Sequence, residues 1–557
     1  MVQRQLDMTT PALDTPTIRA RPRPRVVRLL IGACLAIGVV LRAWQFLANV
    51  SLWKDELPVG TAIIDIDLVA LLTQPLPNDQ VAPKGFLLIE KLAVMTLGSG
   101  DLVLRLFPFA CGVLALFAFA AIALKVLKDV GAVAATAMFA TAVPLIHFGA
   151  QSKQYSVDVC VAIVLWLLAT VLCAAPVTSK RAWGLGLTGA VLAWLSQTAV
   201  FVLAGIGIVF AWWALSNRNL RRPVAVVVAL WSVSAFAVTA AGFASMTPET
   251  VEYMHRYWAL GFAPDRLSTE LSTFWPLDRL LGLISDGVRT QGTVQASFGY
   301  PVAEVYALLA SAGSVLLWLR NRSIALLLLA PIAVALGAAL ARQYPFADRQ
   351  ILFLTPAIVL GIASSIQALS LYVSSRTRLG GYVAAAVLLL PTLSPVVRVL
   401  PPYQSENMKP VLSFVQAHLK AGDAVYVFYR GAAAYTYYAD QYDLRSAEHV
   451  IGGCYADVRD YMRELDRFRG RTRVWVVESA VGTRRIGLQE VLAYLRRIGT
   501  QVDEYRVAPH TIGRVRDDAG VFLFELSGTA VSAEDLALEA SVRIDAICDG
   551  PNTARRR

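Results

Sequence analysis

Residues 28–64 read RLLIGACLAIGVVLRAWQFLANVSLWKDELPVGTAII, an apolar run followed within a few residues by an acidic pair. A helix needs roughly 20 mostly apolar residues to cross a bilayer, so we predict that 28–50 spans a membrane. Arginines precede the run, as in a signal peptide, but LRAWQF follows it in place of a small-x-small cleavage site. We therefore interpret the run as an uncleaved first span, with Asp55 and Glu56 just beyond it.

The chain as a whole is apolar, and its apolar residues are unevenly distributed. Of its 557 residues, 56% are hydrophobic and 16% are charged, and the mean hydropathy is +0.54. Soluble domains contain about 45–50% apolar and about 25% charged residues, so much of this chain must be solvated by lipid. We divide it into a basic cytoplasmic N-terminus (1–27), a transmembrane module (28–400) and a tail (401–557) that reads like a soluble domain.

Much of the excess positive charge, +11 in total, falls in short loops between apolar runs. With the N-terminus inside, the inner loops carry lysines and arginines, whereas the outer connections 151–156 and 196–198 carry only Lys153. This distribution satisfies the positive-inside rule, and it explains the charge without nucleic-acid binding, for which no motif is present. The eleven predicted spans are 28–50, 104–124, 131–150, 157–175, 182–197, 199–215, 223–244, 301–319, 323–341, 350–370 and 379–400.

The orientation of the later spans depends on residues 81–97. This segment is short and contains Glu90 and Lys91, and if it crossed the membrane the charge bias of every later loop would reverse. We predict that it forms an interfacial or re-entrant helix on the outer side. The long or polar connections 51–103, 151–156, 245–300 and 342–349 then face outward, together with the tail.

Asp55 and Glu56 open the first of these outer connections. A carboxylate held at the membrane surface can accept a proton from a hydroxyl group, which suits a transfer reaction to an alcohol. The alternative is that both are ordinary solvated loop acids, because acidic residues are mostly exposed.

Candidate phosphate-binding cations occur in three outer connections. Lys153 lies in HFGAQSKQYSVD (147–158) with Tyr155 and Asp158, and its alternative role is that of a snorkelling lysine beside a helix-start acid. Arg349 lies in ARQYPFADRQILFLTP (341–356) with Arg342, Tyr344 and Asp348. Arginines on the outer face depart from the charge bias, and their planar donor fork fits phosphate oxygens, although an Asp348–Arg349 salt-bridged turn is the alternative. Lys84, at the start of 81–97, is the third candidate.

The order of these features resembles the GT-C superfamily of lipid-phosphate-sugar glycosyltransferases. The nearest group is that of the protein O-mannosyltransferases and aminoarabinose-transferase-like proteins. The resemblance covers about residues 28–400, and one element departs from the pattern, because P-K-G-F replaces a double proline. The matching elements are Asp55-Glu56, Pro83-Lys84-Gly85-Phe86, Gly98, Arg105-Leu106-Phe107-Pro108, the run Lys153 to Asp158, and Tyr344, Arg349 and Pro356.

The resemblance implies a polytopic helical enzyme of about 11 spans that takes a polyprenyl-phosphate sugar as donor. It implies that Lys153, Arg349 and Lys84 hold the phosphate, and that Asp55 acts as general base on an acceptor hydroxyl with inversion of configuration. Glu56 and Asp158 would orient groups or, as in some relatives, contact a divalent metal; spacing alone indicates no metal site. Tyr155 and Tyr344 are carried over as substrate-binding residues. The enzyme would be a hexosyl- or pentosyltransferase of a bacterial inner membrane.

The tail is predicted to be a small extracytoplasmic α/β domain. Strands are expected at 424–429, 473–479 and 520–526 and helices at 408–420, 455–468 and 486–498, an alternation that suggests a largely parallel sheet. Its tyrosines could stack on an acceptor sugar, or they could be core and interface residues. Cys454 and Cys548 could pair if the tail is exported. The aromatic-basic cluster near Trp258 could line the acceptor side or belong to an interfacial aromatic belt.

Two other classes of function are compatible with the sequence. A lipid or polar-solute transporter or flippase would have similar composition, but no internal repeat is evident, and the polar residues cluster in outer loops rather than within spans. A membrane scaffold that displays the tail is the other alternative. The expected partners are a polyprenyl-phosphate sugar, a lipid, glycan or protein acceptor, and membrane lipids.

Overall fold

The computed structural model describes most of the chain, and the described part divides into two compact units. The described residues are 25–173, 178–264, 275–276, 279–280, 302–398, 400–455, 458–479, 488–510 and 518–526. The helical unit comprises Met1–Leu47, Val81–Gly98 and Arg105–Arg398, and the tail unit comprises Ala48–Gln80, Ser99–Leu104 and Val399–Arg557.

Every apolar run predicted to span the membrane contains helix in its described residues. The segment 81–97 is also helical, as α4. In chain order the helices are α1 (Arg25–Leu47), α4 (Lys84–Leu97), α6 (Leu106–Val126), α7 (Asp129–Thr141), α8 (Val143–His147), η1 (Phe148–Ala150), α9 (Tyr155–Cys173), α10 (Ser179–Leu192), α11 (Ala199–Ser216), η2 (Arg218–Leu220), α12 (Arg221–Ala244), α13 (Pro248–Tyr257), η3 (Ala259–Gly261), α16 (Val302–Arg320), α17 (Arg322–Leu340), η4 (Asp348–Leu354), α18 (Thr355–Ser374) and α19 (Arg378–Arg398).

In the described ranges, six helices are long and apolar enough to cross a membrane. The bent pair formed by α7 and α8–η1 raises the number to seven if it is one span. Parts of α9 and α19 are apolar but shorter, and α10 has only 14 residues. The chain is thus a helical protein with several candidate spans, and the count of eleven remains a prediction.

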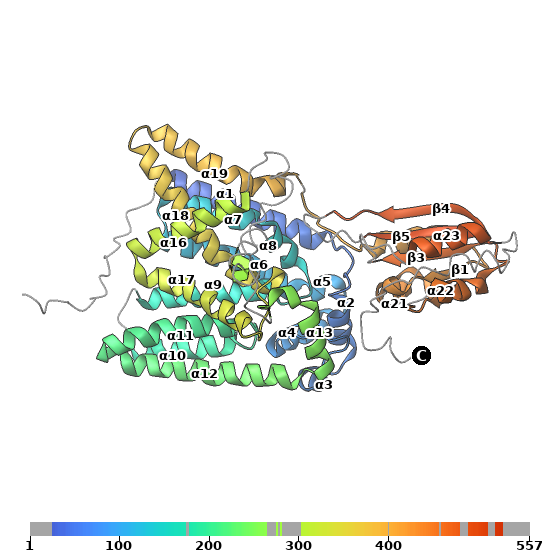
Figure 1. Cartoon of the computed structure of the whole chain (residues 1–557), viewed down its shortest axis with the longest axis horizontal. Helices are drawn as coiled ribbons and strands as arrows, with labels where there is room; N and C mark the ends of the chain where they lie inside the picture. The colour runs from blue at the N-terminus through green and yellow to red at the C-terminus, as the bar shows by residue number, and fades with distance from the viewer. Residues whose placement is uncertain are drawn as a thin grey trace, which may run out of the picture. The chain divides into compact units, whose positions relative to one another are not determined.

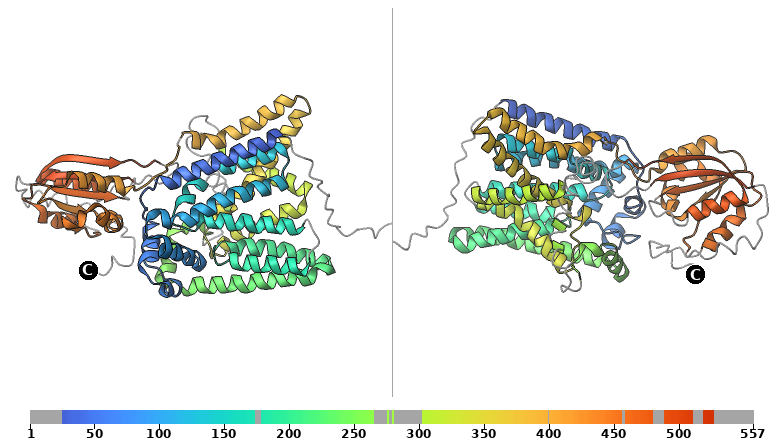
Figure 2. Two further views of the ribbon diagram at one scale, coloured as in Figure 1. Left: turned by 180° about the vertical axis from the view of Figure 1, so that it is seen from behind. Right: turned by 45° about the horizontal axis from the view of Figure 1, so that its top comes forward.

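The helices run alongside one another, with α10, α11 and α12 on one side of the unit and α1, α7, α18 and α19 on the other (Figures 1 and 2). In α18 89% of the apolar window is buried, but in α1 and α12 only 22% is, so these two present apolar faces outward as lipid-facing helices do. Small residues allow close packing at the centre, because a Cβ on Gly205 of α11 would lie 2.5 Å from the nitrogen of Pro331 in α17.

A sharp break between α7 and α8 explains the buried Arg42 of α1. The two helices are bent by 53° at Ala142, just before Pro144, so carbonyl groups at the end of α7 lose helical partners. The guanidinium group of Arg42 donates to the carbonyls of Ala140 at 3.0 Å and Phe139 at 3.2 Å. Arg42 therefore stabilises the helix break.

The tail unit contains a five-stranded sheet with the order β2-β1-β3-β5-β4. Strands β1 (Ala424–Val427), β2 (Glu448–Ile451) and β3 (Val474–Ser479) are parallel, with Ala424 opposite both Glu448 and Val474. Strands β4 (Thr500–Val507) and β5 (Ala519–Glu525) are antiparallel to their neighbours. The prediction of a largely parallel sheet is therefore wrong for this half, because the connection from Val507 to Ala519 is too short for a crossover helix.

Helices and short turns pack around this sheet to complete a mixed α/β domain. The principal helices are α20 (Met408–His418), α21 (Ala432–Tyr438), α22 (Val458–Leu465) and α23 (Leu488–Ile498). The core between the sheet and α22 and α23 is aromatic and aliphatic, and it includes Tyr426, Phe468 and Leu495. Many of the tail tyrosines are accordingly core residues. Cys454 is disulfide-bonded, and the predicted partner Cys548 lies outside the described residues.

Candidate active site

Residues from several connections of the helical unit that were predicted to face outward meet at one end of that unit. The Ser156 hydroxyl at the start of α9 donates to the Pro108 carbonyl at the start of α6, at 2.8 Å. The Gly85 amide at the start of α4 donates to the Trp194 carbonyl at 2.9 Å, just before α11. Polar residues from well-separated parts of the sequence are thereby gathered at a single end of the bundle.

Arg349 lies at the centre of this end, held between two aromatic rings. Its Nε donates to the Tyr155 hydroxyl at 2.8 Å, and its guanidinium carbon lies 5.8 Å from the Tyr155 ring centroid and 5.2 Å from that of Trp258. Its side chain is only 9% exposed, and Asp348 lies 3.7 Å from Nη1. The Asp348–Arg349 pair is thus present but loose, and the aromatic contacts fix the guanidinium plane.

Tyr344 lies in the connection between α17 and η4, close enough to Asp158 and Tyr155 for their charges to affect it. Its hydroxyl lies 3.0 Å from both the backbone and the side-chain carbonyl oxygens of Gln350, and its ring packs on Phe201 of α11 at 4.8 Å between centroids. Burial, aided by the nearby Asp158 and Tyr155, raises the pKa of Tyr344 well above its ordinary value. Tyr344 therefore stays protonated and acts as a hydrogen-bond donor.

Asp158 is buried one turn into α9, where it joins that helix to α11. Its Oδ1 accepts from the Ser196 hydroxyl at 2.6 Å, and the same hydroxyl oxygen accepts from the amide of Ala199, the first residue of α11. Thr198 lies 3.1 Å from Ser196. Asp158 thus orders the 196–199 turn beside Tyr344, which favours an orienting role.

Lys153 and Lys84, the other two predicted phosphate ligands, come from two connections at this end. Lys153 is buried two residues before Tyr155, in a run of buried polar residues from Gln151 to Ser156. Lys84 is the first residue of α4, and partial burial lowers its pKa.

Gly85 explains the departure from a double proline in this part of the sequence. A Cβ at Gly85 would lie 2.6 Å from the carbonyl oxygen of Trp194, a backbone atom that cannot move aside easily. Any larger residue would push the start of α4 away from the α10–α11 turn. Pro83 is in an extended conformation and is the N-cap residue, immediately before the first helical residue, Lys84. In the P-K-G-F sequence, the glycine lets the backbone at the start of α4 approach the Trp194 carbonyl closely, and this contact fixes the position of Lys84.

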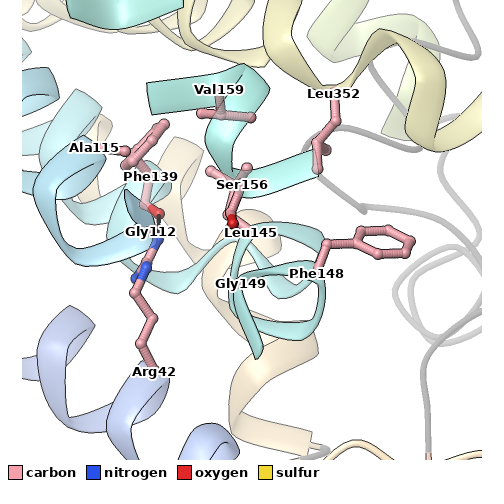
Figure 3. A pocket seen from close by; sticks show the side chains of 10 residues that line it. All are labelled: Arg42, Gly112, Ala115, Phe139, Leu145, Phe148, Gly149, Ser156, Val159 and Leu352. Carbon is pink, nitrogen blue, oxygen red and sulfur yellow. Dashed lines mark hydrogen bonds between the residues drawn. The ribbon is translucent and has the colours of Figure 1, made fainter. Parts of the chain in front are cut away.

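A small cavity of about 10 Å³ lies next to Arg42 and is lined by residues that include Phe148 and Ser156 (Figure 3). Figure 3 shows Arg42 reaching from α1 toward Phe139, with Ser156 on the opposite wall. Ligand pockets are typically about 300–1,000 Å³, so this cavity is far too small for a sugar phosphate. We interpret it as a packing cavity beside the break between α7 and α8.

Asp55 and Glu56 belong to the tail unit, immediately before α2 (Leu57–Asp65). Asp55 is half-buried, whereas Glu56 is 1% exposed. The Glu56 carboxylate accepts a long hydrogen bond of 3.4 Å from the Trp53 amide, closing the turn that holds Asp55. Glu56 therefore has a local structural contact, and Asp55 is the more accessible carboxylate of the pair.

No group of three or more His, Cys, Asp and Glu side chains is arranged to hold a metal ion in the part of the chain that the structure describes. Asp158 is satisfied by Ser196, and Glu56 by its own turn. The divalent metal that the resemblance left open therefore stays a prediction.

Several residues of this end were not assigned these roles from the sequence. Trp258 was expected on the acceptor side or in an aromatic belt, but it packs on Arg349. Ser196 and Gln350 carry no motif that would reveal their bonds to Asp158 and Tyr344. Arg42 could have been found, because an arginine within a predicted span requires a buried partner.

Comparisons with known proteins give distant likenesses only. No protein-family model and no curated protein sequence matches the chain. Among solved structures, AglB oligosaccharyltransferase of Archaeoglobus fulgidus, in complex with an inhibitory peptide and a dolichol-phosphate, aligns over 91% of this chain and 75% of its own, with 11% identity and a TM-score of 0.44. ArnT from Cupriavidus metallidurans, bound to undecaprenyl phosphate, aligns over 89% and 98%, with 13% identity and a TM-score of 0.44. We therefore infer function from this chain's own residues.

Proposed function

We propose that this chain is a membrane glycosyltransferase that transfers a sugar from a polyprenyl-phosphate donor to an acceptor hydroxyl. The observation that carries the proposal is the guanidinium group of Arg349, which is fixed by Tyr155 and Trp258 at one end of a bundle of apolar helices. A cation fixed at the end of an apolar helical bundle suits a ligand with a hydrocarbon chain in the bilayer and a phosphate at the level of the lipid headgroups.

The proposed reaction is a single displacement at the anomeric carbon. The acceptor oxygen forms a bond to that carbon while the bond from the carbon to the phosphate oxygen breaks, so the configuration inverts. Asp55 takes the acceptor proton. The departing polyprenyl phosphate gains negative charge, which Arg349 stabilises with help from Lys153 and Lys84. Tyr155 and Tyr344 orient the donor, and Asp158 orders the turn beside them.

We further propose eleven spans, a cytoplasmic N-terminus, and chemistry on the outer face of a bacterial inner membrane. The basic loops at one end of the helices and the gathered candidate site at the other support this orientation. The disulfide at Cys454 also fits an extracytoplasmic tail, because disulfides persist in oxidising compartments.

Donor consumption by membranes that contain the protein tests the proposal. A panel of radiolabelled polyprenyl-phosphate sugars is supplied with a cell-envelope extract as the source of acceptor. Consumption of one donor, lost in Arg349→Ala and retained in Arg376→Ala, supports the proposal. Arg376 is an exposed arginine in the connection between α18 and α19, which is predicted to face inward, and it is the matched control. Movement of an intact donor across the membrane without cleavage would instead support a transporter or flippase.

A further inference from the structure

The loop that carries Asp55 is bonded directly to the C-terminal α/β domain, within the tail unit. The backbone amides of Leu52 and Lys54 donate to the Tyr438 hydroxyl at 2.7 Å and to the Glu406 carboxylate at 2.9 Å. The Ser51 amide donates to Asn407 Oδ1 at 3.1 Å. Three of the four residues before Asp55 therefore have their backbone held by side chains more than 350 positions later.

Asp101, near the end of the first outer connection (51–103), bonds to the same part of the C-terminal domain as the start of that connection. Its carboxylate accepts from the Tyr438 hydroxyl at 2.6 Å and from the Tyr437 hydroxyl at 3.1 Å, and it pairs with Lys409 Nζ at 2.8 Å. The Lys409 ammonium also donates to the carbonyl of Asn49 at 2.8 Å. Lys409 thus joins residue 49, where the loop begins, to residue 101, where it ends.

This network is buried and well satisfied, which makes it rigid. Asp101 is 6% exposed and Tyr438 is fully buried. The Tyr438 hydroxyl both donates to Asp101 and accepts from Leu52, so a single atom links α21, the start of the loop and its end. Hydrogen bonds to a buried carboxylate are stronger than neutral ones, and buried networks specify one arrangement when all members are paired.

Asp55 lies between fixed neighbours as a result. Lys54 is held on one side by the Glu406 carboxylate, which accepts its backbone amide and also lies 3.5 Å from its ammonium group. On the other side, Glu56 is buried against the Trp53 amide. The backbone of Asp55 has little freedom to move, although its own side chain is only half-buried.

We infer that the C-terminal domain is a positioning element of the transferase, in which Tyr438 and Lys409 act through the loop backbone and Asp101 to hold Asp55 toward the acceptor hydroxyl. The inference rests on the proposed function, since it assumes that Asp55 is the base. A general base must lie within hydrogen-bond reach of the proton it removes, and a displacement of about 1 Å can cost 100-fold in rate.

The test compares Tyr438→Phe with Tyr435→Phe in the full-length protein in membranes. Both tyrosines are buried in α21, but the Tyr435 hydroxyl donates to the Leu444 carbonyl within the domain, at 3.3 Å, and not to the loop that carries Asp55 in the described part of the chain. We expect Tyr438→Phe to lower kcat roughly 10- to 100-fold with the donor KM unchanged. The kcat of Tyr435→Phe should stay within about 2-fold of the wild type, because the hydroxyl lost in this variant bonds within the domain and does not hold the loop that carries Asp55.

A combined variant separates positioning from general destabilisation. If Tyr438 acts through Asp55, Tyr438→Phe should cause no further loss in an Asp55→Asn background, because the base is already gone. An equal loss in both backgrounds, or an equal effect of the two tyrosine variants, would overturn the inference. If Tyr438→Phe does not fold, Ser51→Ala provides a second test at the start of the same loop. It removes the bond that the Ser51 hydroxyl donates to Asn407 and the bond that this hydroxyl accepts from the Lys409 amide, and it keeps the bond from the Ser51 backbone amide to Asn407.

The same data distinguish the two levels of the proposal. Full activity in Asp55→Asn contradicts the proposed function itself. Loss of activity in Asp55→Asn combined with wild-type activity in Tyr438→Phe contradicts only the positioning role of the C-terminal domain.

Discussion

The Nε of Arg349 donates a hydrogen bond of 2.8 Å to the hydroxyl of Tyr155, joining connections 194 positions apart in the sequence. Because the guanidinium is both stacked and hydrogen-bonded through Nε, lysine cannot replace it. We expect Arg349→Lys to lower kcat by about 100-fold or more, the loss typical when a group that stabilises the leaving charge is removed. The matched change Arg376→Lys, on an exposed residue between α18 and α19, should have little effect in the same donor-consumption assay.

Trp258 should contribute to the same site through its contact with Arg349. Cation–π contacts are worth about 0.5–2 kcal/mol, so Trp258→Leu is expected to reduce kcat/KM roughly 2- to 30-fold. Tyr257→Leu is the control, because this neighbouring ring is 51% exposed and packs on Trp258 rather than on Arg349. Identical kinetics for the two variants would show that Trp258 has no part in the site.

Gly85 should not tolerate a side chain. The Cβ of Gly85→Ala would collide with the Trp194 carbonyl, and overpacking of this kind costs about 1–3 kcal/mol. Thermal unfolding in detergent should show a lower Tm and reduced donor consumption. Gly184→Ala is the control, since its Cβ meets nothing within 4 Å in helix α10; alanine is favoured there, so its Tm should be unchanged or higher.

Membrane orientation can be checked by cysteine labelling from the outside of intact cells. In a background without the native cysteines, Ser446→Cys in the tail should react with a membrane-impermeant maleimide. Asn217→Cys, in the basic loop between α11 and α12, should react only after the cells are lysed. Both positions are exposed in the structure, so a difference in labelling reports sidedness. The reverse pattern would invert the topology and place the candidate site on the cytoplasmic side.

The sequence was sufficient to predict α4 and the long helices of the helical unit. Apolar runs locate these helices to within a few residues, because lipid solvation acts on local composition. The helices α2 and α13 were not predicted, and the predicted span 131–150 is broken between α7 and α8. The association of Tyr155, Asp158, Tyr344 and Arg349 followed from placing their connections on one face. The partners themselves did not follow, because Trp258 and Ser196 reach the site through tertiary packing that no periodic pattern records.

In the tail, local sequence patterns predict some strands and miss others. The buried strands β1, β3 and β5 are predicted from continuous apolar runs, but β2 and β4 lie at the edges of the sheet. Edge strands such as EHVI at Glu448–Ile451 are largely exposed and polar, so their sequence lacks a strand signal. The bonds from Tyr438 and Lys409 to the first outer connection are likewise non-local. They were not foreseen, although they bear directly on Asp55.

Donor turnover by Asp55→Asn tests the central claim most directly. Asparagine keeps the size of the side chain but cannot accept the acceptor proton as a carboxylate does, so kcat should fall by about 100-fold or more. Membranes with equal amounts of folded wild type and variant are given the radiolabelled polyprenyl-phosphate sugar that the wild type consumes. Loss of consumption in Asp55→Asn is the result that we predict, and equal consumption by the two proteins would contradict the account.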